Sequence, residues 1–176
     1  MKKIISLTLA IIMITTFMVG CAPKKKPAKE VDLKEVQAAI KEEFGEDYYP
    51  SEEINMEMLK DITGIDEADI ETIISEVPLM SVSIDTFIAI KAKEGKGDAI
   101  ETALEKYRKY YQEDALLYPM NIAKAHAAKV VRHGDYVFYL MFGKHDDRQE
   151  ATEEERLEFA KAEIQRAEDV INKFFK

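Results

Sequence analysis

Residues 129–142 read KVVRHGDYVFYLMF, and this stretch decides the fold class. Two runs rich in Val and aromatic residues, which favour strands, lie on either side of His133-Gly134-Asp135. A Gly-containing turn between two such runs is typical of a β-hairpin. The sequence therefore predicts an antiparallel strand pair here.

A second strand pair is expected upstream. Its first run covers residues 70–82 and bends at Pro78, which has no N–H to donate to a neighbouring strand. After a turn at Ser83–Asp85, the second run covers residues 86–92. Residues 87–90 are apolar on both faces, which is typical of a central strand covered on both sides.

Helical patterns surround these strands, because apolar residues recur at helical spacing before, between and after the strand pairs. Asp32 with Glu35 and Thr152 with Glu155 have the spacing of capping boxes, and Asp98 is placed to cap a helix. The expected helical segments are residues 32–44, 56–63, 98–116, 122–127 and 152–174.

The order of these elements predicts an α+β fold with a small antiparallel sheet of two strand pairs packed with helices, and a long C-terminal helix. Tyr48–Pro50 is interpreted as a loop. A chain of 176 residues has room for one such domain plus appendages, and we assign residues 32–176 to it. The single Cys excludes a disulfide framework and any multi-cysteine metal site.

Charge is unevenly distributed along the chain. The whole sequence has a formal net charge of -9, but the part from Glu30 to the end has 19 basic and 34 acidic residues, a balance of -15. A domain this acidic repels phosphate backbones, so we expect no nucleic acid partner.

Residues 1–20 have the pattern of a signal peptide. Lys2 and Lys3 precede an uncharged apolar run, which is short for a membrane-spanning helix. The run ends in Met18-Val19-Gly20-Cys21, which resembles a bacterial lipobox, although Val19 stands where Ser or Ala is usual. The resemblance implies that Cys21 is lipidated and becomes the mature N-terminus, held at the cell membrane on its extracytoplasmic face by fatty acyl chains such as palmitate.

The alternative is an uncleaved membrane anchor, for which the positive-inside rule and Lys24–Lys26 would place the domain in the cytoplasm. In the lipoprotein interpretation, residues 21–31 are the lipidated Cys and a basic tether rich in Pro and Lys. This tether is either a soluble spacer or a segment attracted to anionic headgroups.

Several stretches of the predicted domain resemble one family. They are Pro78–Ser83, Asp85 with the strand end KAKEG at 91–95, Arg108 in the long helix, Tyr118-Pro119, Lys129–Val131 and His133–Val137. Together they are similar to domain-of-unknown-function family 4358, small lipoproteins of mostly low-GC Gram-positive bacteria, over roughly residues 33–142. The resemblance supports the lipoprotein interpretation and brings no known activity, substrate or catalytic residue.

Three histidines and many carboxylates raise the question of a metal site. His133 lies in the predicted turn and His145 beyond the far end of the same strand, roughly 30 Å away, so they cannot share a metal. His126 can approach His145-Asp146-Asp147, but with no recognised ligand spacing. We expect a polar loop there, with no metal ligands and no cofactor.

Patterns for other catalytic chemistry are weak. No Ser has the surroundings of an activated nucleophile, and Cys21 is expected to carry lipid. With 34 acidic residues, pairs of carboxylates arise by chance. The tyrosines around residues 107–118 can line a ligand groove, but such spacing more often packs one face into the core. No catalytic residue is therefore assigned.

The resulting hypothesis is a membrane-anchored extracytoplasmic lipoprotein whose domain is a non-enzymatic binding or interaction module for an unidentified protein or small molecule. The alternative is a cell-envelope hydrolase with an unrecognised site. A hydrolase would hold convergent titratable groups with perturbed pKa values in a concave pocket. An interaction module would expose an apolar patch or a sheet edge.

Overall fold

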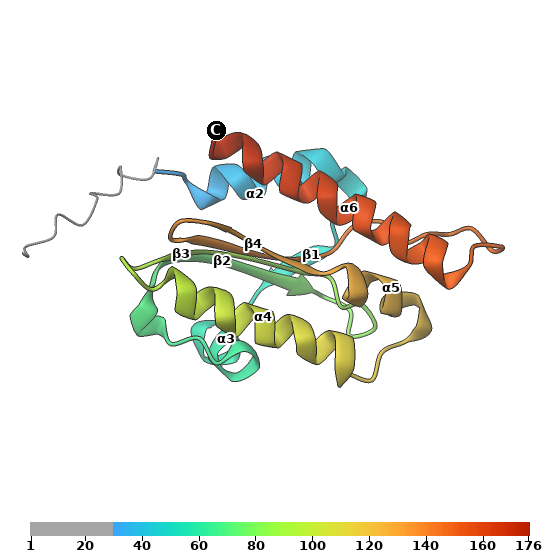
Figure 1. Cartoon of the computed structure of the whole chain (residues 1–176), viewed down its shortest axis with the longest axis horizontal. Coiled ribbons are helices and arrows are strands. Elements are labelled where there is room, and N and C mark those ends of the chain that lie inside the picture. The colour runs from blue at the N-terminus through green and yellow to red at the C-terminus, as the bar shows by residue number, and fades with distance from the viewer. Residues whose placement is uncertain (1–29) are drawn as a thin grey trace, which may run out of the picture.

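A five-stranded antiparallel sheet forms the centre of the molecule in a computed structural model that describes residues 30–176 (Figure 1). Its strand order is β1-β2-β3-β5-β4, and every neighbouring pair is antiparallel. The strands are β1 (Pro50–Glu53), β2 (Ile70–Pro78), β3 (Thr86–Ala92), β4 (Lys129–His133) and β5 (Tyr136–Met141).

Helices cover both faces of this sheet, so the fold has three layers (Figure 1). The helices α2 and α6 lie on one face, α3 and α4 lie on the other, and the short α5 lies at one end. The helices are α2 (Leu33–Phe44), α3 (Met56–Thr63), α4 (Gly97–Glu113), α5 (Pro119–Ala127) and α6 (Glu153–Phe174). The expected α+β class and long C-terminal helix are confirmed.

The central strands explain the two cores. Side chains alternate across a strand, so Phe87 and Ala89 pack under α2 and α6, whereas Ile88 and Ile90 pack under α3 and α4. All of these side chains are fully buried. The apolar run at 87–90 therefore supplies both cores, as expected for a strand that is covered on both sides.

The sheet has one strand more than the two predicted pairs. β1 was expected to be part of a loop, but it pairs antiparallel with β2 at the edge of the sheet. Its sequence, PSEE, lacks the apolar alternation of a strand, because only Pro50 is buried. β2 also ends at Pro78 and not at Val82, and the residues from Leu79 to Asp85 form a turn-rich connection.

The starts of three helices test the predicted caps: one capping box is present, one is only a simple cap, and one cap is absent. Thr152 and Glu155 form the full capping box at the start of α6. Asp32 caps α2, but it accepts a hydrogen bond from the Lys34 N–H and forms no box with Glu35. Asp98 is not a cap, because α4 begins at Gly97 and the Asp98 carboxylate binds Arg132 instead.

Two further observations bear on the environment of the domain. Within residues 30–176, no helix combines the length and apolar character needed to cross a membrane. The predicted signal peptide at 1–20, the predicted lipidation site at Cys21 and most of the predicted tether at 21–31 lie outside the described residues. Val31 is already packed into the core, and its N–H donates to the Tyr136 hydroxyl at 3.0 Å.

Candidate functional site

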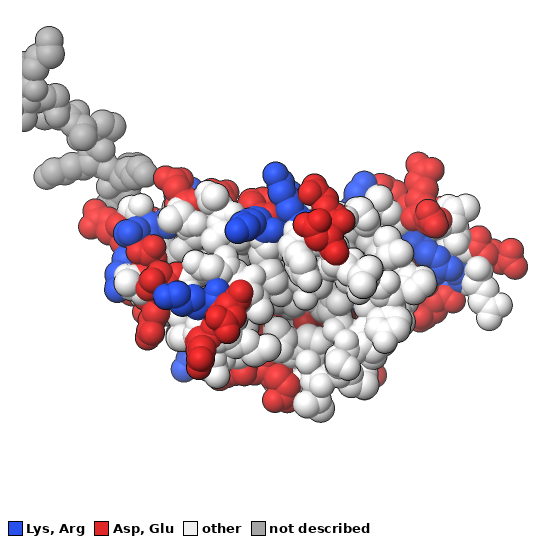
Figure 2. All heavy atoms as spheres, turned by 90° about the horizontal axis from the view of Figure 1, so that it is seen from below, with Lys and Arg blue, Asp and Glu red and all other residues white. Residues whose placement is uncertain are grey.

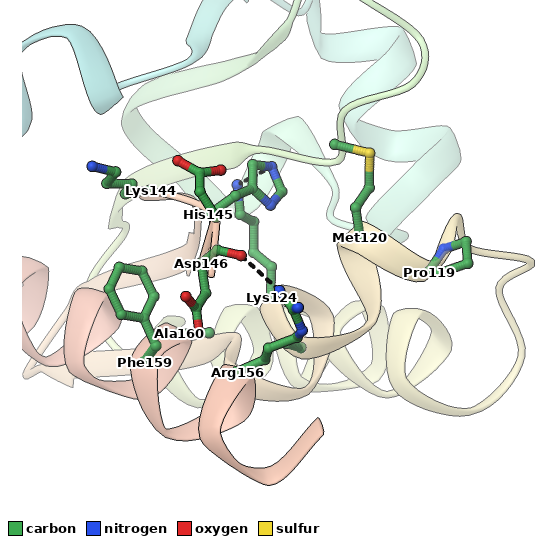
Figure 3. A pocket seen from close by; sticks show the side chains of 11 residues that line it. Pro119, Met120, Lys124, Lys144, His145, Asp146, Arg156, Phe159 and Ala160 are labelled. Atoms are coloured by element: carbon green, nitrogen blue, oxygen red, sulfur yellow. Dashed lines mark hydrogen bonds between the residues drawn. The ribbon is translucent and has the colours of Figure 1, made fainter. Parts of the chain in front are cut away.

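Two adjoining hollows lie between α5 and the first turns of α6. The loop after β5 also lines the first of them, which Figure 3 shows. The volumes of the two hollows are about 450 Å³ and about 560 Å³, within the range of ligand pockets. Both are lined by Pro119, Ala123 and Arg156, so we treat them as one surface, the α5–α6 groove. Its apolar lining consists of Pro119, Met120, Ile122, Ala123, Leu157, Phe159 and Ala160.

The base of the groove holds a buried ion pair. Lys124 Nζ on α5 lies 2.6 Å from Asp85 Oδ1, just before β3, and the two side chains are only 4% and 0% exposed. Charges are removed from water at a large cost, which a close partner and hydrogen bonds must offset. The pair thus ties α5 to the end of the central sheet.

The remaining polar atoms of this pair are also engaged. Lys124 Nζ lies 3.2 Å from His145 Nε2 and 5.7 Å from the centroid of the Tyr49 ring. The second carboxylate oxygen of Asp85 accepts a hydrogen bond from the Ser83 hydroxyl. Burial lowers the pKa of Lys124 from its ordinary value, while the Asp85 carboxylate opposes that shift.

His145 joins the loop after β5 to α5. An ammonium group can only donate, so Nε2 of His145 accepts from Lys124 and the imidazole is neutral. Burial, and then the charge of Lys124, lower the pKa of His145. The backbone of Met120 opposes the shift by favouring the protonated ring. His145 therefore acts as a neutral bridge in the wall of the groove.

Further bonds fix the loop that forms the outer wall. Arg148 binds Asp146 through two nitrogens, at 2.8 and 2.7 Å, and lowers the pKa of Asp146 to about 2. Arg156 donates to the backbone carbonyls of Asp146 and Arg148. Gly143 starts the loop with φ +119°, and a Cβ there would lie 3.0 Å from Glu163 Cβ, so this position requires glycine.

The three histidines lie in different places. His126 lines the second hollow, His145 lines the first, and His133 ends β4, where its ring stacks on Phe175 with centroids 4.2 Å apart. No group of three or more His, Cys, Asp or Glu side chains in residues 30–176 is placed to hold a metal ion. His126 and the segment 145–147 thus make no ligand set.

The tyrosines divide between core and surface. Tyr107 is buried, and its ring contacts those of Tyr111 and Tyr139 at centroid distances of 5.2 Å. Tyr110 and Tyr118 are exposed. None of these side chains lines the α5–α6 groove, so packing, and not a ligand groove, explains the buried member of the set.

Sequence reasoning missed the Lys124–Asp85 pair, because its members are 39 residues apart. One signal pointed to it. Lys124 is the only Lys, Arg, Asp or Glu within PMNIAKAHA, the sequence of α5, and a charged residue in an apolar helix commonly has a buried partner. Asp85 directly precedes a strand that is apolar on both faces, which makes its burial expected in retrospect.

The lining of the groove determines which groups a ligand can contact. Among residues 30–176, no Ser, Thr or Cys lines either hollow. Three lining groups have lowered pKa values, and each has a partner: Lys124 binds Asp85 and His145, and Asp146 binds Arg148. What remains available to a ligand is the apolar lining and the charges on the rim.

Comparison with curated proteins and with solved structures found no match. A family model described as Domain of unknown function (DUF4358) matches residues 44–142. This range contains the whole sheet and the helices α3, α4 and α5, including both members of the buried ion pair, but not the α6 wall of the groove. The match covers more than half of the chain, which therefore belongs to the DUF4358 family.

Proposed function

We propose that this chain is a membrane-anchored, extracytoplasmic lipoprotein whose domain is a non-enzymatic binding module, with the α5–α6 groove as its binding surface. The lipobox-like Met18-Val19-Gly20-Cys21 supports the anchor and its location. Family membership adds no activity, so the support for binding comes from the groove itself.

One observation carries the binding proposal: the groove keeps apolar side chains in contact with water. Met120 is 56% exposed and Ile122 is 46% exposed, and both lie in a concave surface. Concave apolar surface of this kind is typical of binding sites. The charged groups beneath it are paired, which keeps this surface in one shape.

The hydrolase alternative has less support. Perturbed pKa values in a cleft are a feature of catalytic sites, and Lys124 and His145 have them. A nucleophile next to a free base is also required. Ser83 is the hydroxyl nearest to this network, but it donates to the Asp85 carboxylate, which is already held by Lys124.

Accessibility of single introduced thiols in intact cells tests both parts of the proposal. Ile122→Cys places a thiol in the groove, and Tyr110→Cys places one at a similarly exposed apolar position on α4, outside the groove. A membrane-impermeant maleimide should label Tyr110→Cys in intact cells, because the domain faces outward. It should label Ile122→Cys more slowly in cells than in the purified full chain, because a ligand covers the groove.

Each outcome decides one statement. Labelling of Tyr110→Cys only after cell lysis would show that the domain faces the cytoplasm. Equal labelling rates of Ile122→Cys in cells and in the purified chain would show that the groove is empty in the cell. The wild-type chain is the background control, since a lipidated Cys21 has no free thiol.

A further inference from the structure

The charges on the rim of the α5–α6 groove indicate what kind of ligand it accepts. Glu153 and Glu154 line one hollow and Asp147 lines the other. These carboxylates are exposed, and none forms an ion pair with a residue in the described part of the chain. The rim therefore offers three negative charges that a ligand can neutralise.

The basic groups at the same rim are fewer and partly occupied. Arg156 donates both terminal nitrogens to the backbone carbonyls of Asp146 and Arg148. Lys144 is exposed, and its side chain forms no ion pair with any residue in the described range 30–176. Its backbone N–H donates to the Glu163 carboxylate at 3.0 Å. Bonds to neutral carbonyls leave the charge of Arg156 in place, so three exposed carboxylates face two cations, Arg156 and Lys144. The rim therefore has a small excess of negative charge, as does the whole domain, and this excess favours a cationic ligand.

The lining requires that this ligand also be apolar. Met120 and Ile122 project from α5, and Leu157 and Phe159 from α6, on the two sides of the groove. The loop after β2 also exposes apolar side chains, at Leu79 and Met80. Asn121 Nδ2 holds that loop against α5 through the Val82 carbonyl at 2.8 Å.

An extended surface of two joined hollows fits a chain segment better than a single compact molecule. We infer that the α5–α6 groove binds a peptide segment of a protein partner, with apolar side chains in the hollows and Lys or Arg residues flanking them. This inference rests on the proposed function and names the ligand class of the same groove. A membrane surface fits less well, because the acidic rim repels anionic lipid headgroups.

Figure 2 shows the neighbouring face, formed by α3 and α4, with few charged side chains in its middle. Its exposed apolar residues, such as Met58 and Tyr110, are spread over two helices. None of them lines either hollow of the groove. The groove differs from this face in combining a concave shape, an apolar lining and a rim with an excess of acidic groups.

Synthetic peptides test the inference directly. Three fluorescent peptides share one core of Leu, Phe and Ile and carry two Lys, two Ser or two Glu residues at each end. Binding to the full chain in neutral detergent is measured by anisotropy. The Lys-flanked peptide should bind roughly tenfold more tightly than the Glu-flanked one at low salt. The difference should shrink at about 1 M salt, where charges are screened within roughly 3 Å.

Charge reversal at the rim supplies the decisive comparison. The double variant Glu153→Lys/Glu154→Lys should lose the preference for Lys flanks and gain affinity for Glu flanks. The control Glu35→Lys/Glu42→Lys makes the same change in net charge on exposed positions of α2 and should keep the preference. Ile122→Asp should weaken all three peptides, whereas Tyr110→Asp should weaken none.

Contrary results are equally specific. Equal affinities for the three peptides, no binding of the Lys-flanked peptide, or tighter binding to phosphatidylglycerol vesicles than to that peptide would overturn the inference. If Ile122→Cys is shielded in cells while the peptides give such a result, the groove is a binding site for another ligand class. If Ile122→Cys is also unshielded in cells, the groove is not a binding surface and the proposed function fails.

Discussion

Lys124 has its charged group in the interior, where few Lys residues are found. It is tolerated because Asp85, Ser83 and His145 together satisfy the charge and the hydrogen bonds of the pair. Replacing one partner of such a pair is far more harmful than replacing both, since one replacement leaves a lone charge in a dry site. The ion pair therefore holds α5 against the end of the sheet.

Variants of this pair give a first prediction. Lys124→Met should lower the free energy of unfolding by about 3–5 kcal/mol, because it leaves the Asp85 carboxylate buried without a cation. The double variant Lys124→Met/Asp85→Asn removes both charges and should recover a large part of that loss. Urea denaturation of the three proteins measures both quantities. Equal losses in the single and double variants would contradict a role for charge pairing.

The lowered pKa of His145 gives a second prediction, for pH dependence. Its folded-state pKa lies below the ordinary value of 6.5, so the unfolded chain binds more protons between these two values. Stability should therefore fall as pH drops below about 6.5. Protonation would also place two cations 3.2 Å apart, at His145 and Lys124.

Urea midpoints between pH 8 and pH 5 measure this effect. His145→Gln, which cannot titrate, should flatten the profile in this window, whereas His126→Gln should leave its slope unchanged. Asp146 does not contribute to the slope in this window, because its pKa of about 2 lies well below pH 5. A wild-type profile as flat as that of His145→Gln would show that this histidine is not the sensitive group.

At the scale of elements, periodicity was sufficient for most of the fold. The β4–β5 hairpin, the buried β3 and the five helices follow from apolar spacing and capping residues, which are local properties, although α5 begins at Pro119 and not at residue 122. β1 did not follow, because an exposed edge strand with two glutamates gains its structure only from pairing with β2. The groove could not be predicted from local patterns either, because its two walls, α5 and α6, are separated in the sequence by the whole β4–β5 hairpin.

Packing of α6 gives the third prediction. Ile164 is buried with Ala160, Ala167 and Ile171 against the sheet face that also holds Phe138. Ile164→Ala should cost about 2–5 kcal/mol of unfolding free energy, because it leaves a cavity in a close-packed core. Gln165→Ala, at the next, exposed position, should change stability by less than about 0.5 kcal/mol. An unmoved denaturation midpoint for Ile164→Ala would show that α6 is not part of the core.

At the scale of the molecule, the chain enters the domain at the end opposite to the groove. Val31 N–H binds the hydroxyl of Tyr136, the first residue of β5, whereas His145 follows the last residue of that strand. Figure 1 shows the same separation, with the start of the domain and α5 at opposite ends of the sheet. A lipid anchor at Cys21 would therefore leave the groove at the end of the domain away from the tether.

The fourth prediction concerns that anchor. Two acyl chains give stable membrane attachment at about 0.8 kcal/mol per buried CH₂, and a domain with a balance of -15 has little attraction for anionic lipid. Cys21→Ala should therefore release the chain from the membrane fraction or leave an unprocessed precursor. Val19→Ala, which brings the lipobox closer to its usual form, should be processed like the wild type. Fractionation with a radiolabelled palmitate precursor measures both, and an unlabelled wild-type chain with unchanged retention in Cys21→Ala would exclude lipidation.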